Sequence, residues 1–167
     1  MTLSNSSSEP VVLFDTCVIS GMARHDMKPE DEIAVFELAE MAARSELTIW
    51  VSTVAREEID KIPEEHRQIH LDQYDALQKI RASNATWIDT DPVSTGFGTV
   101  QEDPDYTKLR GILKDENDAR LVFQAKAGGV RDFVTVDYKS VLNKSDQLTP
   151  MGVRALSPAQ YLDSRST

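Results

Sequence analysis

Four acidic side chains occupy positions where a surface or turn acid is not expected. Asp15 and Asp137 each come directly after a short apolar run, and Glu58 and Asp118 each lie on a helical stripe that is otherwise apolar. An ionised carboxylate among core residues is costly unless it is paired or bound to a cation. These four residues are therefore the candidates for chemistry.

Helical spacing separates Glu58 from its neighbour Glu57. Positions three or four residues apart share a helix face, so Glu58 shares a face with Val54 and Ile62, whereas Glu57 shares one with Asp60. Glu58 is accordingly the glutamate expected to face the core.

Asp118 shows the same anomaly in a second helical pattern. It lies in line with Leu121 and Ala125, whereas Asp115 and Glu116 are first-turn acids of the kind that the helix dipole favours. For Asp15 and Asp137, which follow predicted strands, the simpler alternative is that each one caps the following helix.

Carboxylates brought close together repel one another, and a hard divalent cation with oxygen ligands removes that repulsion. Mg²⁺ or Mn²⁺ is the natural occupant of such a site. Either ion can polarise a phosphodiester and generate a nucleophilic water near neutral pH. We therefore expect Asp15, Glu58, Asp118 and Asp137 to act as both metal-binding and catalytic residues.

The elements that must position these acids alternate between strands and helices. We predict strands at Val11–Phe14, Leu47–Val51, Thr86–Ile88 and Phe133–Val136. We predict helices at Pro29–Ser45, Thr53–Lys61, 64–82, 106–113, Asp115–Ala127 (closed by Gly128 and Gly129) and Pro158–Leu162, with a surface loop at Thr90–Asp105. This alternation favours a parallel sheet covered on both faces, in which Asp15 and Asp137 emerge at the same edge.

Two of these helices have a predicted buried face. The face of the Pro29–Ser45 helix is expected to hold Ile33, Phe36, Ala39 and Ala43, and that of helix 64–82 to hold Ile69, Tyr74, Leu77 and Ile80.

His66 and His70, spaced i and i+4, could share one metal, but a third ligand and the zinc-protease glutamate are missing, so we expect them on a solvated helix face.

Length and charge place limits on the class of protein. The chain has 167 residues and a formal net charge of −10, which indicates one domain and disfavours coating of duplex DNA. We expect a disordered tail at 1–9 and one domain at 10–163 with a long helical and loop segment at about 62–114. The single cysteine, the lack of a visible secretory signal and apolar runs too short to span a bilayer predict a cytoplasmic protein with no membrane partner.

Basic residues stand near the acidic motifs along the chain. Arg56, Lys114 and Arg120 are candidates to bind the backbone of a nucleic-acid substrate, because phosphate contacts position a strand. Ion pairing to the many acids is the alternative for the same residues.

The order and spacing of four motifs resemble those of PIN-domain ribonucleases, including toxin-type members. The motifs are Val12–Ile19, Ser52–Ile59 ending in Glu58, Asn117–Leu121 and Val134–Asp137, and the segment Leu156–Leu162 is similar to the way toxin-type members end. The resemblance implies a PIN-like three-layer α/β/α sandwich with a central parallel sheet. It also implies Mg²⁺- or Mn²⁺-dependent cleavage of RNA by the four acids, with Thr16 and Thr135 hydrogen-bonding near the site. An antitoxin protein and a second copy of the chain are the partners that a toxin-type member would have.

Two other functions remain open at this stage. One is an inactive PIN-fold module that binds RNA or protein, against which the four intact acids count. The other is a phospho-acceptor signalling domain, which would need an acid pair near the first strand where Phe14-Asp15-Thr16 supplies one acid.

Overall fold

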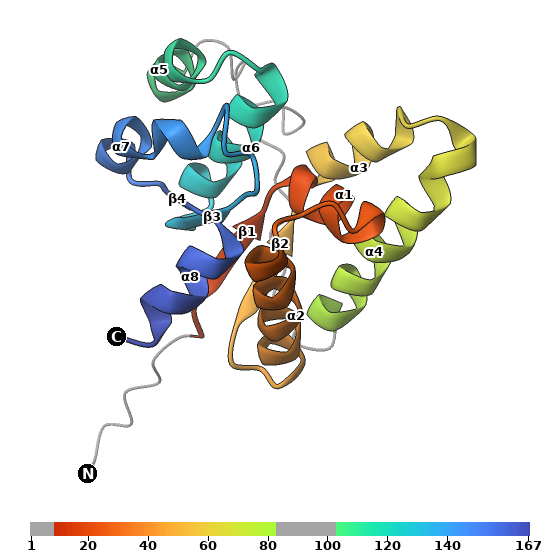
Figure 1. Ribbon diagram of the computed structural model, residues 1–167. Coiled ribbons are helices and arrows are strands. Elements are labelled where there is room, and N and C mark those ends of the chain that lie inside the picture. The colour runs from red at the N-terminus through yellow and green to blue at the C-terminus, as the bar shows by residue number, and fades with distance from the viewer. Residues whose placement is uncertain (1–8, 83–102) are drawn as a thin grey trace.

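The computed structural model describes residues 9–82 and 103–167. In these residues, four strands form one parallel sheet in the order β2-β1-β3-β4 (Figure 1). The strands are β1 (Val11–Phe14), β2 (Thr48–Val51), β3 (Asp132–Val134) and β4 (Arg154–Leu156). Leu13 on β1 is paired in register with Trp50 on β2 and Phe133 on β3.

Helices cover both faces of this sheet and make a three-layer α/β/α sandwich (Figure 1). The helices are α1 (Thr16–Arg24), α2 (Pro29–Ala43), α3 (Thr53–Asp60), α4 (Glu64–Ala82), α5 (Pro104–Ile112), α6 (Glu116–Ala127), α7 (Ser145–Leu148) and α8 (Pro158–Arg165). Helices α1, α2, α4 and α8 pack on one face, and α5, α6 and α7 pack on the other. The predicted α/β class and the parallel sheet are confirmed.

The central strand β1 is apolar on both sides because each face of the sheet has its own core. Successive side chains of a strand point to opposite faces. Val12 and Phe14 belong to the core with α1, α2 and α4, whereas Leu13 belongs to the core with α5 and α6. All three side chains are buried.

The strand order creates a switch point between β1 and β3. From β1 the chain passes through α1 and α2 to β2 on one side, and from β3 it passes to β4 on the other side. In open parallel sheets, ligands bind outside the carboxyl ends of the strands at such a point. Asp15 directly follows β1, and Thr135 directly follows β3, so both residues stand at this position.

Several local predictions are corrected by the structure. Helix α1 was not predicted, and β3 ends at Val134, although the Thr135 amide still donates to the Leu156 carbonyl at 3.0 Å. Pro104 begins α5 and so does not belong to the predicted loop. The predicted strand at Thr86–Ile88 and most of that loop lie outside the described residues.

The predicted faces of two helices are also wrong in part. On α2 the buried residues include Ala34, Val35 and Leu38, whereas Ile33 and Phe36 are 67% and 56% exposed. On α4, Tyr74 and Leu77 are buried as predicted, but Ile69 is 47% exposed. The side chain of Ile80 is outside the described part.

Candidate active site

The four predicted acids line one cavity at the carboxyl edge of the sheet. This cavity has a volume of about 340 Å³, and its walls include Asp15, Glu58, Asp118, Asp137 and a fifth acid, Asp115. The acids come from the ends of β1 and β3 and from α3 and α6, which are far apart in sequence. The structure therefore brings all four predicted site residues to one place.

Asp15 occupies the N-cap position of α1 but does not cap that helix. Its side chain accepts no capping hydrogen bond from the backbone of α1. Instead its Oδ2 accepts from Thr135 Oγ1 at 2.7 Å and from Cys17 Sγ at 3.1 Å. Burial raises the pKa of the Asp15 carboxyl, and the nearby charge of Asp137 raises it further. The Asp15 carboxyl is thus directed mainly to side chains at the carboxyl edge of the sheet.

Cys17 is held as a neutral donor in this arrangement. Burial raises the pKa of the Cys17 thiol well above its usual value, and the negative charge of Asp15 adds to that shift. The nucleophile in cysteine chemistry is the thiolate. A protonated Cys17 therefore supports Asp15 through a hydrogen bond and is a poor nucleophile.

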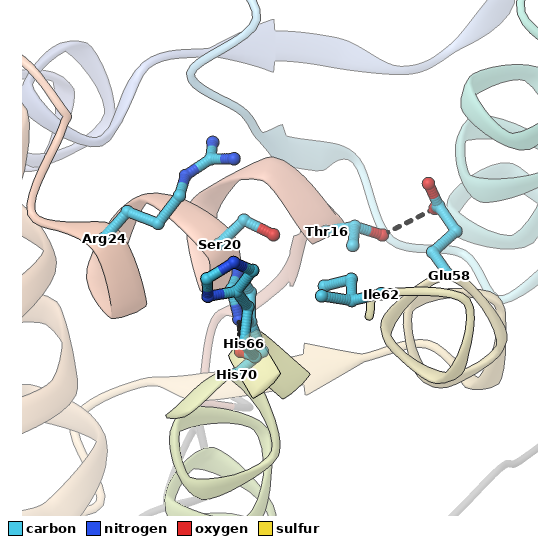
Figure 2. A pocket seen from close by; sticks show the side chains of 7 residues that line it. All are labelled: Thr16, Ser20, Arg24, Glu58, Ile62, His66 and His70. Atoms are coloured by element: carbon cyan, nitrogen blue, oxygen red, sulfur yellow. Dashed lines mark hydrogen bonds between the residues drawn. The ribbon is translucent and has the colours of Figure 1, made fainter. Parts of the chain in front are cut away.

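Glu58 reaches the cavity from α3, whose first turn is capped by Ser52. The Ser52 hydroxyl accepts from the Val54 amide at 3.0 Å. The half-buried Glu58 accepts a hydrogen bond from Thr16 Oγ1 at 2.7 Å (Figure 2). Burial raises the pKa of Glu58, and the charges of Asp15 and Asp115 act in the same direction.

Asp118 is a strained acid in the cavity. It lies in the first turn of α6, where Asp115 is the N-cap and accepts from the amides of Asn117 and Asp118. Burial raises the pKa of Asp118 from 3.8 to about 7, and the charges of Asp15, Asp115, Asp137 and Glu58 all contribute. Near neutral pH this carboxyl is ionised in only part of the molecules, since burial and the neighbouring acids both disfavour its charged form.

Asp137 is held by the loop that follows β3. Its Oδ1 accepts from the amides of Lys139 at 3.1 Å and Ser140 at 2.8 Å, and its own amide donates to Thr135 Oγ1 at 3.0 Å. The next residue anchors the same loop, because the Tyr138 hydroxyl donates to the buried Asp31 at 2.5 Å. Asp137 thus combines a local turn role with a place on the cavity wall.

The carboxylates share a cavity without forming a finished set of metal ligands. In the part of the chain that the structure describes, no group of three or more His, Cys, Asp or Glu side chains is arranged to hold a metal ion. The oxygens of Asp15, Glu58 and Asp137 are directed toward their own hydrogen-bond donors.

The three predicted substrate-binding cations lie in different surroundings. Arg120 pairs with Glu57 at 3.0 Å, and Arg56 pairs with its helix neighbour Asp60 at 3.1 Å. Lys114 instead lines a further cavity of about 580 Å³ together with Lys139 and Lys144, which we call the lysine cavity. Asp115 and Ser140 line this cavity and the acidic one, so the two are adjacent.

Sequence reasoning missed several residues that line the acidic cavity. Ser20 and Arg24 belong to α1, the helix that was not predicted, and Asp115 was assigned only a helix-dipole role. Once α1 is recognised, the spacing of Thr16, Ser20 and Arg24 at i, i+4 and i+8 places all three on one face.

Comparison with known proteins finds no relative of this chain. No protein-family model matches the sequence, and neither a curated protein nor a solved structure matches it. No helix in the described residues is both long enough and apolar enough to cross a membrane. Any inference about the function of the site therefore depends on its own geometry and chemistry.

Proposed function

We propose that this protein is an Mg²⁺- or Mn²⁺-dependent endoribonuclease that hydrolyses RNA phosphodiester bonds. The observation that supports this proposal most strongly is the gathering of Asp15, Glu58, Asp118 and Asp137 around one cavity at the switch point of the sheet. Their order along the chain also resembles the acidic motifs of PIN-domain ribonucleases.

The chemistry of the donor set fits a hard divalent cation. All four side chains offer carboxylate oxygens, which are the ligands that Mg²⁺ and Mn²⁺ prefer. The raised pKa of Asp118 supports the same conclusion, because five acids share this cavity with Arg24, which itself pairs with Asp26. Among the described residues the carboxylates do not converge as a ligand set, so a bound cation would require them to turn inward.

The residues that line the acidic cavity have distinct parts in the proposed reaction. A bound ion would supply a Lewis acid for the phosphodiester and a water of lowered pKa. Asp15 is oriented by Thr135 and Cys17, and Glu58 is oriented by Thr16. These hydroxyl and thiol donors thereby fix two of the four carboxylates that line the cavity.

The lysine cavity supports RNA as the substrate. Lys114, Lys139 and Lys144 stand beside the acidic cavity in a protein of net charge −10. Basic groups gathered on one face allow an acidic protein to bind a polyanion. Arg56 and Arg120, which are engaged with acids, have a weaker claim to this role than Lys114.

The biological setting of this activity rests on the sequence resemblance alone. A cytoplasmic toxin of a toxin–antitoxin pair, with an antitoxin protein and a second copy of the chain as partners, is the setting that we propose.

The direct test is RNA cleavage by the purified protein. Single-stranded RNA should be cut in the presence of Mg²⁺ or Mn²⁺, and cleavage should stop when EDTA is added. Cleavage that persists in EDTA would reject the metal mechanism. Absence of cleavage, together with RNA binding, would instead favour a binding module on the same fold.

A further inference from the structure

A third cavity adjoins the acidic one and shares no lining residue with the lysine cavity. It has a volume of about 350 Å³ and lies between α1, the end of α3 and the start of α4 (Figure 2). Its size falls in the range of pockets that hold small organic ligands. It is contiguous with the acidic cavity, because Thr16, Ser20, Arg24 and Glu58 line both.

Two helices present polar side chains to this space at regular spacing. Thr16, Ser20 and Arg24 lie on successive turns of α1, and His66 and His70 lie one turn apart on α4 (Figure 2). Helices α1 and α4 pack against each other. We name the space between these two rows the histidine cavity.

His70 is a buried ring with a fixed orientation. It is only 4% exposed, so the expected solvated position is wrong for this residue, whereas His66 is exposed. Its Nδ1 lies 2.9 Å from the His66 carbonyl oxygen, which can only accept, so Nδ1 carries the proton of this hydrogen bond. In the neutral ring Nε2 is then an acceptor for a donor group on a ligand.

The rest of the wall can bind the other parts of a nucleotide. Arg24 pairs through Nε with Asp26 at 2.9 Å, and its guanidinium also has two terminal amino groups suited to phosphate oxygens. The exposed ring of His66 offers a flat surface on which a base can stack. The hydroxyl of Ser20 and the apolar side chain of Ile62 complete the surface.

We propose that the histidine cavity binds one ribonucleotide of the RNA strand next to the phosphodiester that is cut. Arg24 contacts its phosphate, His66 stacks on its base, and His70 Nε2 accepts a hydrogen bond from its base or ribose. The strand then runs from the lysine cavity across the acids to this subsite. The inference rests on the proposed function and specifies where that function holds its substrate.

Binding can be tested without cleavage by nuclear magnetic resonance of the histidine rings. The chain has three histidines, and His25, which pairs with Glu32 at 2.7 Å and does not line the cavity, is an internal control. Titration of the full chain in EDTA with adenosine or uridine 5′-monophosphate should shift the ring ¹⁵N signals of His66 and His70 but not His25. Unchanged signals of His66 and His70 at saturating nucleotide, or equal shifts of all three rings, would overturn the proposal.

Kinetics of RNA cleavage provide the second arm. Arg24→Ala, which removes a charge-assisted contact, and His66→Ala, which removes a stacking surface, should each raise KM for a short single-stranded RNA by about tenfold with little change in kcat. Arg131→Ala is the matched control, because Arg131 is exposed and precedes β3 at the opposite edge of the sheet. Parent-like KM values in both cavity variants would refute the subsite while leaving the nuclease intact. A parent that cuts no RNA but shifts its His66 and His70 signals would refute the nuclease and leave the nucleotide site.

Discussion

At the scale of single residues, the hydrogen bonds of Asp15 separate a site residue from a structural cap. Asp15 stands at the N-cap of α1, yet its side chain turns to Thr135 and Cys17. Asp115, by contrast, caps α6 in the usual way and also faces the cavity. The difference depends on where the Thr135 hydroxyl and the Cys17 thiol lie in space, so the sequence could nominate Asp15 but could not distinguish a site residue from a cap.

Glu57 and Glu58 make a matched pair that tests the orientation of α3. Glu58→Gln should abolish RNA cleavage, because Glu58 faces the acidic cavity and accepts from Thr16. Glu57→Gln should leave cleavage close to the parent and cost at most about 1 kcal/mol of stability, since its pair with Arg120 is 48% exposed on the Glu57 side. Both variants are measured by initial rates in Mn²⁺ and by chemical denaturation. The reverse ranking of rates would mean that Glu57 is the site residue.

Asp118 predicts a pH dependence of stability in the metal-free protein. Its folded-state pKa is raised from 3.8 to about 7, so between these pH values the folded state binds more protons than the unfolded state. The free energy of unfolding contributed by this group is therefore highest below pH 3.8 and is lost as pH rises to about 7. In EDTA, Asp118→Asn should show a smaller fall over this interval than the parent when both are unfolded with urea. Equal pH slopes in the two proteins would show that Asp118 carries no such strain.

At the scale of elements, helix existence was predictable where caps and periodicity agree. Ser52 caps α3. Gly128 and Gly129 follow the last residue of α6, and Gly129 has φ +70, a left-handed conformation that favours glycine. Helix α1 was missed because Val18, Ile19 and Gly21 are weak helix formers. Its stability comes from tertiary packing, since all three residues are buried.

The orientation of α2 could not be derived from its sequence because apolar residues surround the helix. Ile33 and Phe36 are as apolar as Val35 and Leu38, yet only the second pair is buried. Leu38→Ala should therefore lower the free energy of unfolding by about 2–5 kcal/mol. Phe36→Ala should change it by no more than about 0.5 kcal/mol, as is usual for an exposed position. Urea denaturation of the two variants decides between the two faces, and a larger loss for Phe36→Ala would contradict the observed one.

At the scale of the whole molecule, the sheet explains how separate motifs become one site. The alternation of strands and helices was sufficient to predict a parallel sheet, and hence that Asp15 and Asp137 share an edge. The strand order β2-β1-β3-β4, which places the switch point between the first and third strands, follows from long-range pairing that local patterns do not encode. The two cavities that adjoin the acidic one depend on that pairing too, and the sequence alone did not reveal them.

We propose that the four acids of the cavity form one cation site, and a Mn²⁺ titration of thermal stability tests this site without any need for substrate. An ion that binds only the folded state at 100 times its Kd adds about 2.7 kcal/mol, which raises the melting temperature by about 5–10 °C for a protein of this size. The parent, unfolded thermally in EDTA and then in increasing Mn²⁺, should show this rise. Asp118→Asn should start from a higher melting temperature in EDTA at neutral pH, because it removes a strained charge, and should respond to Mn²⁺ far less. A variant that is less stable than the parent in EDTA and responds equally to Mn²⁺ would contradict the account and make Asp118 a structural residue.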